Sequence, residues 1–134
     1  MITKDDAWLA GWLALTMAML GVLASQVYSY LKHDRTIARR RDLSDDEFAA
    51  LAMHVDRATL LRLRTMFADW CQIPAGKLRM FDQPADWPDS DSSGFVRQLE
   101  TAFDVRFKQE GLQKCNGTFE AVVKLVLEAR NDGQ

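Results

Sequence analysis

Few side chains in this sequence have the types and spacing that chemistry requires. The two cysteines, Cys71 and Cys115, and the two histidines, His33 and His54, do not match a zinc-binding spacing. The sequence contains no glycine-rich phosphate loop, no G-x-S-x-G motif and no paired-carboxylate motif. We therefore predict that the protein is not an enzyme, that it holds no metal ion and that both thiols are free.

The residues with the most chemical potential lie in an acidic stretch. Residues 82–104 contain six acidic side chains and one basic side chain, Arg97. We expect three of these acids, Asp89, Asp91 and Glu100, to form a face that attracts a protein partner with a basic patch. A solvated face without a partner is the alternative. Ser90 lies within this stretch and offers a hydroxyl group.

Helical periodicity predicts the elements that position these residues. Ser44 and Glu47 have the spacing of a capping box, and Thr118 is suited to cap a helix at its N-terminus. Apolar residues with helical spacing then mark four helices: Phe48, Leu51, Ala52 and Val55; Leu60, Leu63, Met66, Phe67 and Trp70; Phe95, Val96, Leu99, Ala102 and Phe103; Phe119, Val122, Val123, Val126 and Leu127.

The remaining segments predict loops. Residues 77–91 contain two prolines and four aspartates without helical periodicity, so we expect a loop there. The third helix is expected to start at Asp91 or Ser92, with Ser92 and Ser93 as cap residues. Val105, Phe107 and Leu112 are expected to anchor a short irregular segment. With no strand of useful length, the predicted fold class is all-α.

A run of 25 residues without a charged side chain or histidine, Ala7–Leu31, precedes these helices. As a helix this run is about 37 Å long, more than the roughly 30 Å hydrocarbon core of a bilayer. Trp8 and Trp12 at one end and Tyr28 and Tyr30 at the other suit the membrane interfaces. We predict a single transmembrane anchor, which is too long for the apolar region of a cleaved signal peptide and lacks its basic start.

The charges that flank this run predict its orientation. Five basic residues follow it and one precedes it: Lys32, Arg35, Arg39, Arg40 and Arg41, against Lys4. The positive-inside rule therefore predicts a single-pass cell-membrane protein whose C-terminal domain is cytoplasmic. Small residues every four positions, such as Gly21, Ser25 and Ser29, raise the hypothesis of a homodimer through the span. With 17 basic and 19 acidic residues, the chain is not expected to coat nucleic acid.

The order and spacing of the later helices resemble those of an acyl carrier protein over residues 58–129. The similar segments are 73–79 after the first helix, the Asp-rich loop, 99–107 at the end of the second helix, and 118–123 at the start of the last. The resemblance implies a helical bundle in which a serine at the start of the second helix carries 4'-phosphopantetheine. Counted back from Phe103 without a gap, that serine position falls on Asp89; with one deletion in the loop it falls on Ser90, where Asp91 replaces the leucine of the family's Asp-Ser-Leu signature.

Two functions follow from these observations, and a stand-alone helical domain whose likeness to carriers is architectural only is a third possibility. The first is a membrane-tethered, acyl-carrier-like binding or scaffold module without a prosthetic group, which docks a cytoplasmic or membrane-associated partner through its acidic second helix. The second is a genuine membrane-anchored acyl carrier with 4'-phosphopantetheine on Ser90, serving lipid or acyl-transfer enzymes. The predicted organisation is an anchor over residues 1–31, a basic juxtamembrane linker over 32–43, a capped helix over 44–57 and the carrier-like domain over 58–130.

Overall fold

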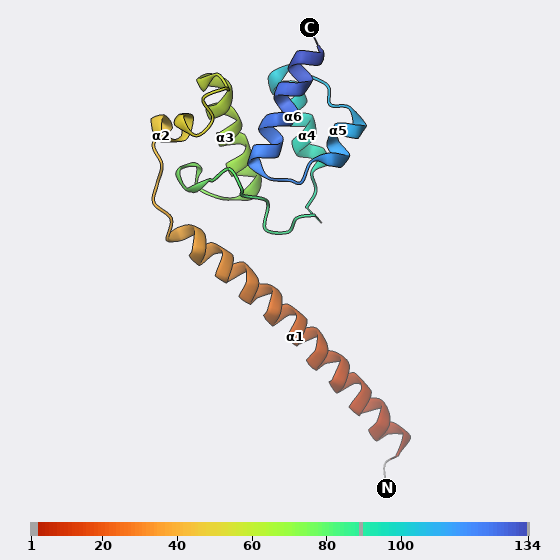
Figure 1. Ribbon diagram of the computed structural model, residues 1–134. Coiled ribbons are helices and arrows are strands. Elements are labelled where there is room, and N and C mark those ends of the chain that lie inside the picture. Colours follow the sequence, from red (N-terminus) through yellow and green to blue (C-terminus); the bar gives the residue numbers. More distant parts are fainter. Residues whose placement is uncertain (1–2, 89, 134) are drawn as a thin grey trace. The chain divides into compact units, whose positions relative to one another are not determined.

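The computed structural model describes residues 3–88 and 90–133, and every regular element within them is helical, with no strand (Figure 1). This confirms the predicted all-α class. The chain divides into two compact units, Met1–Arg39 and Arg40–Gln134. The elements are α1 (Lys4–Ala38), α2 (Asp45–Ala50), α3 (Arg57–Cys71), the 3-10 helix η1 (Ala75–Lys77), α4 (Ser93–Phe103), α5 (Gln109–Lys114) and α6 (Phe119–Asp132).

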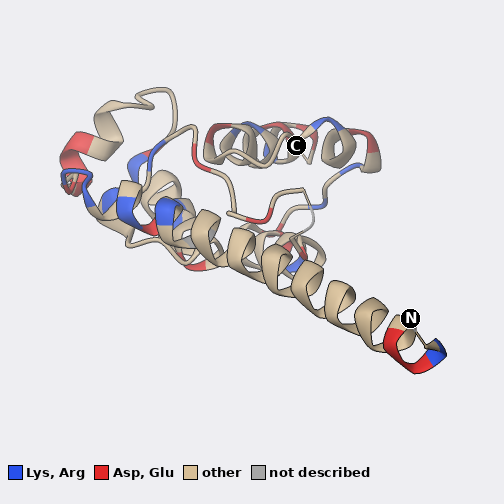
Figure 2. Ribbon diagram, turned by 90° about the horizontal axis from the view of Figure 1, so that it is seen from below, with Lys and Arg blue, Asp and Glu red and all other residues tan. Residues whose placement is uncertain are grey.

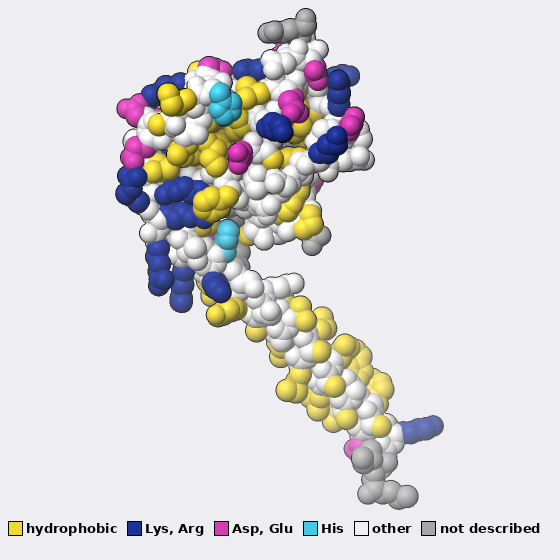
Figure 3. Space-filling view, in the orientation of Figure 1, with side chains coloured by type: hydrophobic (Ala, Val, Ile, Leu, Met, Phe, Trp, Pro, Cys, Tyr) yellow, Lys and Arg dark blue, Asp and Glu magenta, His cyan; other side chains and the backbone are white. Residues whose placement is uncertain are grey.

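The first unit is the single helix α1, which is 35 residues long. The helix begins with a capping box between Thr3 and Asp6. It is long and apolar enough to span a membrane: its most apolar stretch has a mean hydropathy of 1.8 and contains no buried side chain. Figure 2 shows it without charges between its first turn and its last turns, and Figure 3 shows hydrophobic side chains along it. It continues seven residues beyond Leu31, because the basic segment that follows contains no proline or glycine to end a helix. Much of the expected juxtamembrane linker is therefore helix.

In the second unit, the N-terminal caps form as the sequence predicts. The Ser44 hydroxyl accepts a hydrogen bond from the Glu47 amide, and the Glu47 carboxylate accepts one from the Ser44 amide. Thr118 caps α6 by accepting a hydrogen bond from the Ala121 amide. Each hydroxyl satisfies a backbone donor that has no partner within its helix, which fixes where α2 and α6 begin.

Aromatic rings from four helices form the centre of the core. Phe119 of α6 lies between Phe67 of α3 and Phe48 of α2 and packs edge-to-face against both. The ring centroids are 5.3 Å apart for Phe67 and Phe119 and 5.5 Å apart for Phe48 and Phe119. Trp70 of α3 stacks on Phe95 of α4 at 4.3 Å. Because edge-to-face and stacked rings pack favourably beyond the area they bury, these contacts hold α4 against the C-terminal end of α3.

Two predictions about these helices are wrong in detail. Leu51 was expected on the buried face with Phe48, but α2 ends at Ala50 and Leu51 is 54% exposed, since the chain turns before a second helical turn is complete. The segment expected to be irregular around Leu112 contains the six-residue helix α5. The loop over residues 77–91 contains turns but no α-helix among its described residues, as predicted.

Candidate functional site

The predicted acidic face begins at the N-terminus of α4, where Asp89 lies outside the described residues. The Asp91 carboxylate accepts hydrogen bonds from the hydroxyl of Ser93 at 2.7 Å and from its backbone amide at 3.2 Å. These bonds lower the pKa of Asp91, with the hydroxyl contributing most. Asp91 therefore caps the helix start, whereas the Ser92 side chain, which we expected to do so, makes no capping hydrogen bond.

Ser90, the candidate for a prosthetic group, has a buried hydroxyl oxygen. Its Oγ is shielded from solvent and has no hydrogen-bond partner among the described residues. A modifying enzyme must reach that oxygen to form a phosphodiester. In this conformation the Ser90 Oγ is not accessible to such an enzyme.

The acidic surface is smaller than its sequence suggests. Asp82 was counted among its six acids, but it is only 5% exposed and pairs with Arg40 at 2.5 Å. Glu100 is half-buried on α4, and its carboxylate accepts a hydrogen bond from the Phe107 amide at 3.3 Å. Asp86 and Asp104 remain exposed. The acids available to a partner on the described part of this surface are thus Asp86, Asp91, Asp104 and, in part, Glu100.

Beside α4 lies a cavity of about 400 Å³, here called the apolar cavity. Its apolar lining comes from α3, α4, α5, α6 and the loop before α4, and consists of Trp70, Trp87, Phe95, Val96, Leu99, Leu112, Val122 and Leu125. Its polar lining includes Arg97 and Glu100, which come from the solvent-facing side of α4. A concave apolar surface with a few polar groups at its edge is the usual form of a binding site.

Trp87 reaches this cavity because Gly117 allows its ring to approach the backbone. Gly117 has a positive φ of 80°, and a Cβ added to it would lie 2.5 Å from the Trp87 ring. Only glycine avoids both the backbone strain and the steric overlap at this position. The turn before α6 therefore holds one wall of the apolar cavity.

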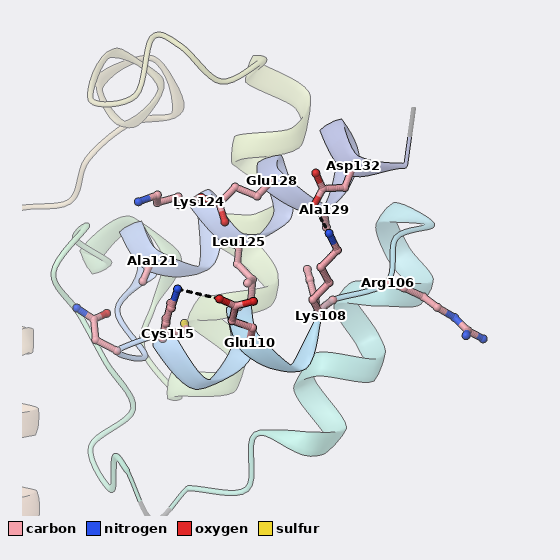
Figure 4. Close-up of a pocket in the computed structure, with 14 residues that line it drawn as sticks. Arg106, Lys108, Glu110, Cys115, Ala121, Lys124, Leu125, Glu128, Ala129 and Asp132 are labelled. Carbon is pink, nitrogen blue, oxygen red and sulfur yellow. Dashed lines mark hydrogen bonds and ion pairs between the residues drawn. The ribbon is translucent and has the colours of Figure 1, made fainter.

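A second hollow, of about 590 Å³, lies between α5 and α6 (Figure 4). Four of its charged residues form two ion pairs: Lys108 with Asp132 of α6 at 3.3 Å, and Lys114 with Glu110 within α5 at 3.1 Å. Since these exposed pairs already balance each other's charge, the hollow presents no concentrated charge to a ligand. The apolar cavity is the stronger candidate site.

The cysteines differ in environment. Burial in the core, with smaller contributions from Asp82 and Asp86, raises the pKa of Cys71 to about 12, so its thiol is not activated. Cys115 is half-buried and borders both hollows. Among the described residues, no three His, Cys, Asp or Glu side chains gather as a metal ion requires.

Comparison with known proteins identifies no relative: no family model, no curated protein and no solved structure matches this chain. The resemblance to acyl carrier proteins therefore remains a prediction from sequence pattern.

Sequence reasoning missed three residues that matter for the site and its support. Trp87 lies in the segment that we predicted only as a loop, and no signal in the sequence singled out Gly117, which contacts Trp87 in the structure. Arg64 is 4% exposed in the core of the second unit. A signal for Arg64 existed, since it lies four residues after Leu60 and three before Phe67, on the apolar face of its helix.

Proposed function

We propose that this protein is a membrane-tethered helical binding module that works without a prosthetic group. Helix α1 crosses the membrane once, and the basic residues at its end keep the C-terminal unit in the cytoplasm, as the positive-inside rule requires. The C-terminal unit docks a cytoplasmic or membrane-associated protein on the surface of α4.

The apolar cavity is the observation that carries this proposal. Its volume of about 400 Å³ suits a large apolar side chain of a partner, and such anchors inserted in pockets dominate binding energy at protein interfaces. Glu100 borders this cavity, and Asp91 and Asp104 are exposed just before and just after α4, so these acids favour basic residues beside that anchor. The partner segment is therefore an apolar side chain flanked by lysine or arginine.

Site-specific photo-crosslinking in native membranes tests this docking. A benzophenone amino acid replaces Arg97, which is exposed and borders the apolar cavity. The same group at Lys124 of α6 is the matched control, because it also removes an exposed cation but lies outside that cavity. We expect a discrete adduct from position 97, none from position 124, and a basic segment in the crosslinked partner peptide.

Two further variants connect the adduct to the cavity and its charge. Leu112→Trp fills the cavity from a half-exposed position on α5, and Glu100→Gln removes the charge while keeping an acceptor for the Phe107 amide. Both should reduce the adduct severalfold, with near-ultraviolet circular dichroism confirming that the variants fold. An adduct of equal yield from positions 97 and 124, or one that neither variant reduces, would refute the proposal.

The second candidate is a genuine acyl carrier with 4'-phosphopantetheine on Ser90. The apolar cavity close to the start of α4 favours it, since an acyl chain needs such a space. The buried Ser90 Oγ opposes it. Intact mass after co-expression with a broad-specificity phosphopantetheinyl transferase separates the two: a gain equal to one phosphopantetheinyl group, lost in Ser90→Ala, establishes the carrier, and an unchanged mass supports the module without a prosthetic group.

A further inference from the structure

Residues 40–43, which follow α1 and were predicted to be part of a linker, are held in place by hydrogen bonds to another part of the second unit. Arg40 donates a hydrogen bond to the Lys77 carbonyl at 3.1 Å, and the Lys77 ammonium donates one to the Arg40 carbonyl at 2.8 Å. The Leu43 amide donates to the Gly76 carbonyl at 2.8 Å, and the Arg79 guanidinium to the Arg41 carbonyl at 2.5 Å. These bonds hold residues 40–43 against residues 76–79.

These bonds tie the loop over residues 76–81 to residues 40–43, which follow α1 closely in the chain. The helix ends at Ala38 and Arg40 already belongs to the second unit, so Arg39 alone connects them. The two Cα–Cα steps from Ala38 to Arg40 span at most about 7 Å. The seven helical residues after Leu31 rise about 10 Å. If α1 is the membrane span, as the proposed function holds, residues 40–43 and the loop bound to them therefore lie within about 20 Å of the end of the apolar run, close enough to reach the headgroups.

Phe81 in this loop exposes a large apolar ring, which is unfavourable in water. It is 68% exposed, and the Arg40 guanidinium lies 5.3 Å from the centre of its ring. An exposed aromatic ring is suited to the headgroup region of a bilayer, where it meets the acyl boundary. The Arg40 side chain itself is 17% exposed and paired with Asp82, so it supports the ring and leaves lipid phosphates to other cations. Phe81 is one of three large apolar side chains that are more than half exposed in the described part of the second unit, together with Leu51 and Met53.

The charge on this face differs from that of the unit as a whole. Residues 40–134 carry 13 basic and 16 acidic side chains. The face itself carries four cations, Arg40, Arg41, Lys77 and Arg79, against the three acids that pair with them, Asp42, Glu47 and Asp82. Arg41 is 70% exposed, and Arg79 donates its side-chain hydrogen bonds only to backbone carbonyls. A net positive face on a net negative unit favours an anionic surface.

We propose that Arg40, Arg41, Arg79 and Phe81 form a lipid-facing patch that rests on anionic headgroups. Phe81 enters the interface, and Arg41 and Arg79 contact lipid phosphates. The patch fixes which side of the second unit faces the bilayer.

Fluorescence quenching in nanodiscs tests this patch on the full chain. With Cys115 replaced by serine and Cys71 buried, a bimane label at Phe81→Cys supplies a flat apolar ring in place of the phenyl group. Met53→Cys is the matched control, because Met53 is an exposed apolar residue outside the patch. The quencher is a lipid with a nitroxide in its headgroup region, in discs of phosphatidylcholine with or without phosphatidylglycerol.

We expect quenching at position 81 to be at least threefold stronger than at position 53, and to fall by half or more without phosphatidylglycerol. Equal quenching at the two positions would overturn the patch, and quenching independent of lipid charge would overturn its preference for anionic headgroups. A label at Val22→Cys with an acyl-chain nitroxide reports the span separately. Quenching at position 22 without quenching at position 81 rejects the patch alone, whereas its absence at position 22 rejects the membrane tether and the patch with it.

Discussion

Arg64 should be the most sensitive single residue for the stability of the second unit. Its guanidinium is 4% exposed and donates to the Leu43 carbonyl at 2.7 Å, to the Ala75 carbonyl at 2.9 Å and to the Asp45 carboxylate at 2.9 Å. It also lies over the Phe48 ring, 4.4 Å from its centre. Burial lowers the pKa of Arg64, and the nearby Asp45 partly opposes that shift.

Arg64→Met keeps an unbranched stem in α3 and removes the charged head. The Leu43 carbonyl then loses its donor, at a cost of about 1–3 kcal/mol, while the Ala75 carbonyl keeps the Leu78 amide and loses only a second bond. The contact with Phe48 adds about 1 kcal/mol, and the ion pair with Asp45, whose side chain is 66% exposed, adds little. We expect a total loss of about 3 kcal/mol, or a fall in Tm of about 12–24 °C for a unit of this size.

Thermal melts of the full chain in detergent, followed by near-ultraviolet circular dichroism, measure this loss. Arg62→Met is the control on the same helix, because Arg62 is exposed and donates to the Ala102 carbonyl at 2.9 Å. It should cost less than about 1 kcal/mol. Hydrogen exchange should also show a faster Leu43 amide in Arg64→Met alone. A Tm for Arg64→Met within 5 °C of the unaltered protein, or equal losses in both variants, would refute the reasoning.

Three other predictions concern the turn before α6, the buried thiol and a helix cap. Gly117→Ala should lower the free energy of unfolding by about 1–3 kcal/mol, because Gly117 has a positive φ and an added methyl group would overlap the Trp87 indole. Gly94→Ala, in open space on α4, should raise it by about 0.5–1 kcal/mol. Urea unfolding measures both changes. Cys71 should resist alkylation at pH 8 until the protein is denatured, as mass spectrometry of labelled peptides would show, since its pKa is about 12. Hydrogen bonds from the Thr59 side chain and, to a lesser extent, its backbone amide lower the pKa of Asp56. The stability that ionised Asp56 contributes is therefore complete above its unfolded pKa of 3.8 and is lost as the pH falls through the lower folded pKa. The Tm should drop below about pH 4, and it should drop less steeply in Asp56→Asn.

Local signals in the sequence predicted much of the fold. The capping box of Ser44 and Glu47 and the cap at Thr118 need only a few neighbouring residues, so they could be read without any knowledge of packing. The apolar spacing of α3, α4 and α6 likewise depends on the helix alone. The α-helical class followed from these elements.

Features that depend on distant residues could not be predicted in the same way. Asp82 was taken for a surface acid because its partner Arg40 lies 42 residues earlier in the chain, in a segment that was expected to be a linker. The wall that Trp87 forms depends on the backbone of Gly117, 30 residues later. The apolar cavity needs side chains from four helices, which no single stretch of sequence displays.

The central claim, that the apolar cavity beside α4 is where a partner docks, is tested most directly by the yield of the photo-adduct from position 97 with and without Leu112→Trp. Filling the cavity should reduce this yield severalfold while the fold and the level of protein in the membrane stay unchanged. An undiminished yield in the filled variant would contradict it.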